Sequence, residues 1–207
     1  MSEAPGESIV DVFESDARGI TALAVSLAET TDRFDDEVET AQLVREIVES
    51  QAAAELTLHP LIRRHLPAGD AVAEEQFHTH RQMETCLRRL ESADVTSTEF
   101  RAILGEVRDR WLANAAHLAT EVYPALRANC SSSELRQAGE AALVAEYRGP
   151  TRPRHLAVET PGVDTLISFS EGFVDKTIDA FTHRGHAGTE EIHERLRSGR
   201  YDNLEAD

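Results

Sequence analysis

The sequence is poor in residues that interrupt helices, and it has few aromatic residues or cysteines. It contains 11 glycines, 7 prolines and 2 cysteines among 207 residues, and aromatic residues make up 5%. Scarce glycine and proline leave long helices intact, because both residues destabilise a helix interior. Cys86 and Cys130 provide neither a disulfide framework nor the spacing of a zinc site. We therefore expect an all-α protein in a reducing, cytoplasmic location.

Basic residues and long apolar runs are also scarce. The chain has 21 Lys and Arg against 38 Asp and Glu, which gives a formal net charge of -17. This excess predicts that nucleic acid is not a partner, because its phosphates would be repelled. No apolar run approaches the roughly 18 residues of a membrane span, and the first ten residues do not resemble a secretory signal. We therefore expect no membrane partner either.

Four amphipathic stretches predict the core of the fold. In each stretch, apolar residues recur at spacings of three and four, which places them on one face of a helix. Short polar connections separate the stretches, and helices joined in this way pack antiparallel. We predict an up-down four-helix bundle over residues 8–128, with helices at about 8–29, 40–66, 70–91 and 96–128.

Typical capping residues predict where the helices begin. In a capping box, a hydroxyl side chain is followed three positions later by an acidic one, and the two satisfy each other's backbone amides. A single aspartate can also cap a helix start. These patterns predict helix starts at Ser8-x-x-Asp11, Asp70, Thr96-x-x-Glu99 and Ser131-x-x-Glu134.

The sequence beyond residue 128 is less regular. After a fifth helix ending near Tyr147 and a proline-rich connector, residues 163–184 carry a strong apolar stripe at helical spacing. That stripe must be buried, either on the bundle or in a homodimer or other partner. The predicted organisation is a flexible N-terminus at 1–7, the bundle at 8–128, a helical extension at 129–185 and a polar tail at 186–207.

The second and fourth predicted helices share one pattern. Small residues occupy the middle of the inward stripe, and a residue-proline pair, His59-Pro60 or Tyr123-Pro124, follows near the end. Proline lacks the amide donor and its ring clashes with the preceding turn, so each helix should break or kink there. The small residues leave room in the core.

These features resemble the hemerythrin-like (HHE) cation-binding domain. The resemblance covers roughly residues 8–127. It rests on four helices, an acidic residue near the middle of the first, the HP and YP pairs, and the third helix, QFHTHRQMETCLRRLE. In that family, histidines and His-x-x-x-Glu pairs hold two iron atoms. Residues four apart share a helical face, so each helix can present an imidazole and a carboxylate to one point.

Most positions that the resemblance assigns to iron ligands carry other residues here. Only His80, followed by Glu84, matches, and one histidine with one carboxylate would not hold two irons firmly. We therefore expect a degenerate centre without the ordinary two-iron site, so that iron is not the favoured cofactor and none can be named. The positions concerned are Ala17, Ser50, Ala54, His80, Asn114 and Leu118.

The favoured hypothesis is that the vacated core binds a small molecule. Truncated side chains predict a cavity, and an imidazole near a carboxylate can exchange protons at neutral pH. His80 and Glu84 would be the acid-base or polar groups. The other predicted ligand-binding residues are Ala17, Ser50, Ala54, Asn114, His117 and Leu118.

Two alternatives remain open. One is a relocated metal site, with iron and oxygen or nitric oxide chemistry. At about 100° per residue, Glu55 and His59 face away from the Ser50/Ala54 stripe, so this site needs a one-residue irregularity in the helix. The other is a non-catalytic module that dimerises or docks through residues 163–184. The relocated ligands would be Glu55, His59, His80, His117 and Glu121.

Overall fold

The computed structural model describes residues 6–29 and 36–148, and all regular structure within them is helical. This confirms the all-α expectation for that part of the chain. The predicted segments at 163–184 and 186–207 lie outside the described residues. The elements are α1 (Ile9–Glu29), α2 (Asp36–Ala53), η1 (Ala54–Leu58), α3 (His59–His65), α4 (Gly69–Ser92), α5 (Thr98–His117), η2 (Leu118–Val122), α6 (Tyr123–Asn129) and α7 (Ser132–Arg148).

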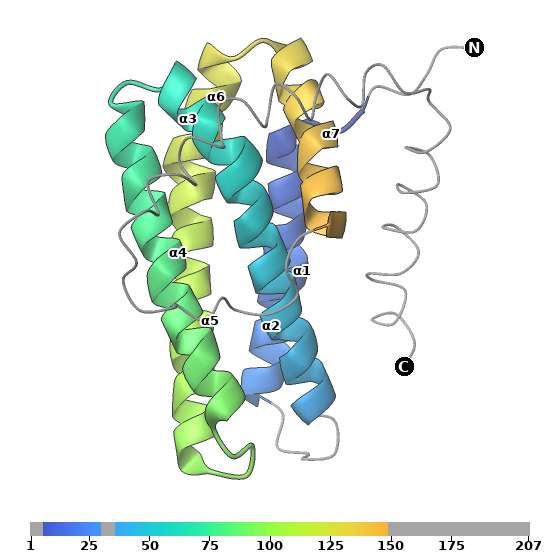
Figure 1. The fold of residues 1–207 in the computed structure, drawn as a ribbon, viewed down its shortest axis with the longest axis vertical. Coiled ribbons are helices and arrows are strands. Elements are labelled where there is room, and N and C mark those ends of the chain that lie inside the picture. Colours follow the sequence, from blue (N-terminus) through green and yellow to red (C-terminus); the bar gives the residue numbers. More distant parts are fainter. Residues whose placement is uncertain (1–5, 30–35, 149–207) are drawn as a thin grey trace, which may run out of the picture.

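Elements α1 to α6, together with η1 and η2, form long rods that lie side by side (Figure 1). The first rod is α1 and the third is α4. The second rod consists of α2, η1 and α3, and the fourth of α5, η2 and α6. The rod α1 packs against α2 and α5, while α4 packs against α3 and α5. None of the helices described combines the length and apolar character that a membrane crossing requires.

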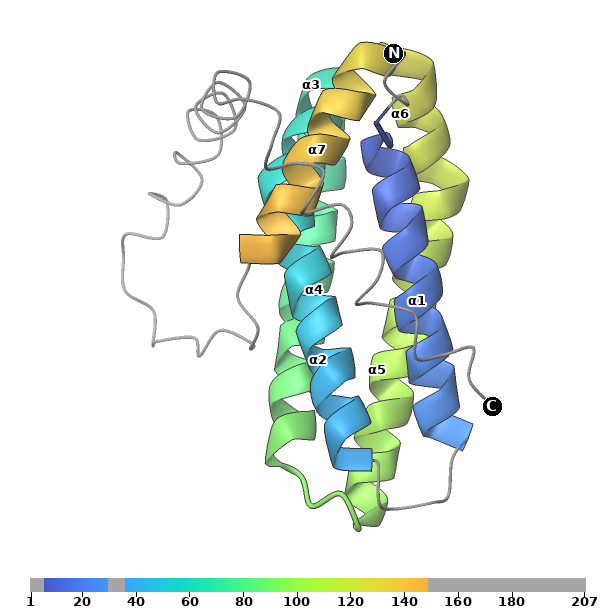
Figure 2. The same ribbon diagram turned by 90° about the vertical axis from the view of Figure 1, so that its right-hand side faces the viewer.

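Helix α7 lies alongside α1 and α2 (Figure 2). Its position depends on Gly139, where an added Cβ would overlap the carbonyl oxygen of Glu7. The absence of a side chain therefore allows α7 to rest on the backbone at the start of α1. This contact joins the beginning and the end of the described chain.

Two of the predicted capping boxes are confirmed. At the start of α1, the Ser8 amide donates to the Asp11 carboxylate at 3.3 Å, and the Asp11 amide donates to the Ser8 hydroxyl at 3.3 Å. At α7, the Ser131 amide donates to Glu134 at 3.0 Å, and the Glu134 amide donates to the Ser131 hydroxyl at 3.2 Å. Each pair satisfies amides that the first turn leaves without partners.

The other two predicted caps are wrong. Ser97, not Thr96, caps α5 and accepts from the Phe100 amide at 3.0 Å, because the Thr96 hydroxyl and amide both donate to Asp94. Helix α4 begins one residue before Asp70 and has no side-chain cap. Its start is set by backbone geometry: the preceding Ala68 adopts a left-handed conformation with φ 53°.

Within the part of the chain that the structure describes, the apolar core consists of two clusters along the rods. The lower cluster, at the bottom of Figure 1, is built from the C-terminal parts of α1 and α4 and the N-terminal parts of α2 and α5. The upper cluster takes the opposite ends of these rods and adds residues from α7. Burial of these two sets of side chains provides the main favourable contribution to folding.

Candidate functional site

Buried polar side chains lie between the lower and the upper apolar cluster along the rods. Asp16, Ser50, Gln51, Gln76 and His80 are all buried, and each falls in sequence between the stretches that form the lower and upper clusters. A buried polar group costs free energy unless it is hydrogen-bonded. This stretch of the interior, which we call the polar layer, is therefore the candidate site.

The second rod contains a π-helical turn next to the polar layer. In η1 the His59 amide donates to the carbonyl of Ala54, five positions earlier. The cause is the following residue, Pro60, which has no amide donor and whose ring would crowd the carbonyl of Leu56 in a regular α-helix. The Thr57 hydroxyl donates to the Ala53 carbonyl at 2.7 Å, which provides a partner for one carbonyl near the widened turn.

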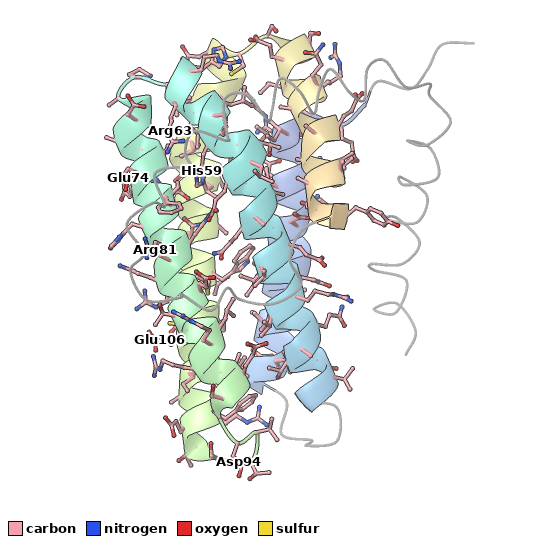
Figure 3. The ribbon with its side chains drawn as sticks, viewed as in Figure 1. His59, Arg63, Glu74, Arg81, Asp94 and Glu106 are labelled. Atoms are coloured by element: carbon pink, nitrogen blue, oxygen red, sulfur yellow. The ribbon has the colours of Figure 1, made fainter. Side chains whose placement is uncertain are left out.

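The π turn changes the direction in which Glu55 and His59 point from the direction expected in a regular α-helix. One extra residue in a turn offsets the following helical face by about 100°. As a result His59 is 2% exposed, and its ring centre lies 5.1 Å from that of His80 on α4, with the planes inclined by 33°. Figure 3 shows His59 where the second rod faces α4. Proline therefore supplies the one-residue irregularity that the relocated site required.

Burial keeps His59 neutral. Its pKa is lowered from 6.5 to about 2, first because burial penalises the charged ring and then because His80 and Arg63 lie nearby. The His59 Nε2 atom is buried and has no hydrogen-bond partner. A neutral imidazole with an unsatisfied interior nitrogen can bind a ligand by a hydrogen bond or through a lone pair.

His80 lies against a carboxylate from the second rod. Its Nδ1 atom is 3.3 Å from Oε1 of Glu55, whose side chain is 22% exposed. A carboxylate oxygen accepts, so Nδ1 carries a proton and Nε2 remains available for another contact. Glu55, His59 and His80 thus form one group, which we call the imidazole centre. Glu84, the predicted partner of His80, is half-buried on the same helix.

The fourth rod repeats the π turn with different residues. In η2 the Tyr123 amide donates to the Leu118 carbonyl, again five positions earlier and again next to a proline, Pro124. Tyr123 is 2% exposed, and its pKa is raised by burial and then by the charge of Asp16. His117 and Glu121 pair with each other, with Nδ1 3.5 Å from Oε1.

The remaining predicted ligand-binding residues vary in burial. Ser50 and Ala54 are buried, whereas Ala17, Asn114 and Leu118 are half-buried. Ala17 and Ala54 belong to different apolar clusters. The sequence predicted Glu55 only as a metal ligand, not as a hydrogen-bond partner of His80. Pro60 could have indicated this contact, because it causes the π turn that brings Glu55 to His80.

The donors at the family's positions do not fit the iron centre that the resemblance implies. Ala17, Ala54 and Leu118 have no side-chain atom that can coordinate a metal. In the described residues, no group of three or more His, Cys, Asp and Glu side chains is placed to hold a metal ion. Of the six positions that the resemblance assigns to iron ligands, only position 80 carries the residue type that the family uses, a histidine.

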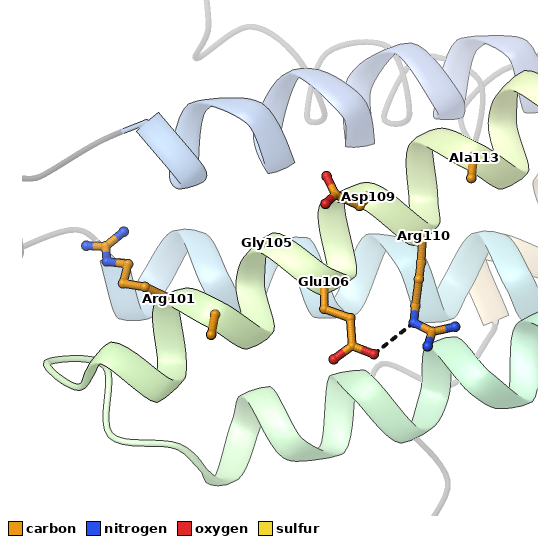
Figure 4. A pocket seen from close by; sticks show the side chains of 7 residues that line it. Arg101, Gly105, Glu106, Asp109, Arg110 and Ala113 are labelled. Atoms are coloured by element: carbon orange, nitrogen blue, oxygen red, sulfur yellow. Dashed lines mark hydrogen bonds and ion pairs between the residues drawn. The ribbon is translucent and has the colours of Figure 1, made fainter.

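A surface hollow of about 650 Å³ lies on the outer face of α5 (Figure 4). Its walls include Glu106 and Arg110, which pair at 3.0 Å, and Glu106 also accepts from Arg89 and from the Cys86 thiol on α4. These charged groups therefore bind one another across two rods. The lining residues, none of which was predicted to bind a ligand, are Arg101, Ala102, Gly105, Glu106, Asp109, Arg110 and Ala113.

The sequence matches no model of a known protein family, and no curated protein matches it.

Proposed function

We propose that residues 8–128 form a hemerythrin-like, up-down four-helix bundle that binds a small polar molecule in its interior instead of two irons. Four rods with short connections support the architecture. The observation that carries the function is the unpartnered, buried Nε2 atom of His59 beside His80. A buried nitrogen without a partner costs free energy that a bound polar molecule would recover.

The chemistry of this site follows from two imidazoles with different surroundings. His59 stays uncharged and offers Nε2 to the bound molecule. His80, oriented by Glu55, can exchange a proton with that molecule, because an imidazole paired with a carboxylate supports general acid-base chemistry. Ser50 and Ala54, which precede His59 in the same rod, are buried and have small side chains.

Imidazole nitrogen NMR spectra of the chelator-treated full chain test this function. Formate and acetamide serve as probes, and native mass spectrometry of the purified protein detects any molecule that is carried through purification. We expect a bound molecule to shift the signals of His59 and His80 and to leave the exposed His78 unchanged. His59→Leu should abolish the shifts. The function is wrong if no molecule is retained and neither probe shifts the two signals.

A further inference from the structure

We propose that His59 and His80 together bind one divalent cation through their Nε2 atoms, with Zn²⁺ as the best match. The inference rests on the ligand centre of the proposed function and deepens it. A cation held by two protein nitrogens keeps open positions, and a small polar molecule or water can occupy them. Of the ligand positions implied by the family resemblance, only His80 is shared.

His59 carries a nitrogen that faces the interior of the protein. A metal-binding histidine must supply an unprotonated nitrogen. Among the described residues, the His59 Nε2 atom is buried without a hydrogen-bond partner, so no protein group competes with a cation for this nitrogen.

His80 contacts the carboxylate of Glu55 through the ring nitrogen that would not bind the cation. Histidines that bind metals commonly donate their other ring N–H to a carboxylate, which fixes the tautomer and raises the basicity of the binding nitrogen. The Nδ1 atom of His80 lies 3.3 Å from Glu55, and this arrangement leaves Nε2 as the binding atom. Glu55 acts here as a positioning residue rather than as a metal ligand.

The spacing of the His59 and His80 rings matches that of two imidazoles bound to one cation. Their centres are 5.1 Å apart. Two imidazoles bound at about 2.0–2.1 Å in adjacent positions of a tetrahedron have ring centres about 5 Å apart. The observed separation therefore needs little movement of either helix.

The type of cation follows from the donor atoms. Two imidazole nitrogens suit Zn²⁺ and similar transition metals, whereas Ca²⁺ and Mg²⁺ require oxygen ligands. In the proposed site the protein supplies two ligands, the Nε2 atoms of His59 and His80. Tetrahedral Zn²⁺ then keeps two exchangeable positions.

Cobalt titration of the metal-free full chain tests the site, because tetrahedral Co²⁺ absorbs visible light strongly and Zn²⁺ should displace it. We expect one Co²⁺ per chain, with the tetrahedral spectrum lost in His59→Leu and in His80→Leu. Glu55→Gln should weaken binding by about 10- to 100-fold, as loss of such a carboxylate does elsewhere. His78→Leu, at an exposed position on α4, is the matched control and should bind like the unchanged protein.

Circular dichroism of each variant verifies that its helices are intact. Absence of binding, a weak octahedral spectrum, or equal binding by folded His59→Leu would each overturn the cation site. If formate or acetamide contacts His59 in metal-free protein that takes up no Co²⁺, this inference fails and the proposed function stands. If Co²⁺ binds as expected but no molecule does, the cation site stands and the small-molecule function fails.

Discussion

The two π turns share a backbone cause but present different chemistry to the interior. Each is followed by a residue-proline pair, and each contains a threonine whose hydroxyl donates to the carbonyl four positions earlier, Thr57 to Ala53 and Thr120 to Ala116. The first turn buries His59, and the second buries Tyr123. The residue before proline thus sets which group enters the core.

The carboxylates of the two turns also behave differently. Glu55 reaches across to His80 on another rod, whereas Glu121 is 71% exposed and pairs with His117 in its own rod. A contact between rods can orient an interior side chain, while an exposed pair within one helix contributes little. The proposed function therefore uses the first turn and gives the second a mainly structural role.

The largest expected effect is on stability in acid. The pKa of His59 falls from 6.5 in the unfolded chain to about 2 in the folded protein. Below pH 6.5 the unfolded state therefore binds more protons, and stability falls by at most about 1.4 kcal/mol per pH unit. His59→Leu should remove this dependence, so the variant should gain roughly 2–3 kcal/mol relative to the unchanged protein by pH 4.5. Urea unfolding from pH 7 to pH 4.5 measures the difference.

The second turn should show the opposite dependence on pH. The pKa of Tyr123 is raised by burial, so its stabilising effect is complete below about pH 10, the ordinary tyrosine pKa, and is lost as pH rises above it. Tyr123→Phe should flatten the alkaline part of the curve of stability against pH and leave the acid part unchanged.

If the unchanged protein and His59→Leu lost stability in parallel as the pH falls, that result would contradict the distinction between the two turns.

A smaller effect is expected for the two carboxylates. Glu55→Gln should destabilise the fold by about 1 kcal/mol, because it weakens a contact to the buried His80. Water screens this contact only partly, since the Glu55 side chain is 22% exposed. Glu121→Gln should change stability by less than about 0.5 kcal/mol, since the Glu121 side chain is 71% exposed to water. Equal losses in denaturant unfolding would remove the assigned difference.

The smallest effect on stability, but a distinct structural one, is expected for the prolines. Pro60→Ala and Pro124→Ala should each cost about 0.4–1 kcal/mol, mainly because the unfolded chain gains freedom. The restored amide at position 60 also permits a regular α-helix, which would turn His59 away from His80. Nuclear Overhauser contacts between the two rings should therefore weaken in Pro60→Ala and persist in Pro124→Ala.

Sequence reasoning anticipated the helices because their signals are local. The boxes at Ser8 and Ser131 depend on residues three apart, and a reader of the sequence can see them. The start of α4 was missed because its cause is tertiary: an added Cβ at Gly69 would overlap the Ile62 carbonyl of the preceding rod. This close approach and the left-handed Ala68, rather than a side-chain cap, accompany the start of α4.

The imidazole centre was missed in part because it depends on helical phase. Regular helical geometry places His59 off the inward stripe, and only a π turn returns it. The proline that causes this turn was interpreted as a kink. The prediction therefore placed the irregularity correctly but expected His59 to point away from the inward stripe. Glu55 and His80 are 25 residues apart, and their contact follows once that phase is known.

The contact at Gly139 has a consequence for how this unit can be transferred or divided. Leu135, Ala138 and Ala142 of α7 share the upper cluster with Ile9 and Phe13 of α1. A fragment cut at residue 128 would expose that surface to water, lower the cooperativity of unfolding and promote aggregation. A module for fusion or recombination should therefore keep α7 through Arg148, so that the two ends of the described chain are exchanged together.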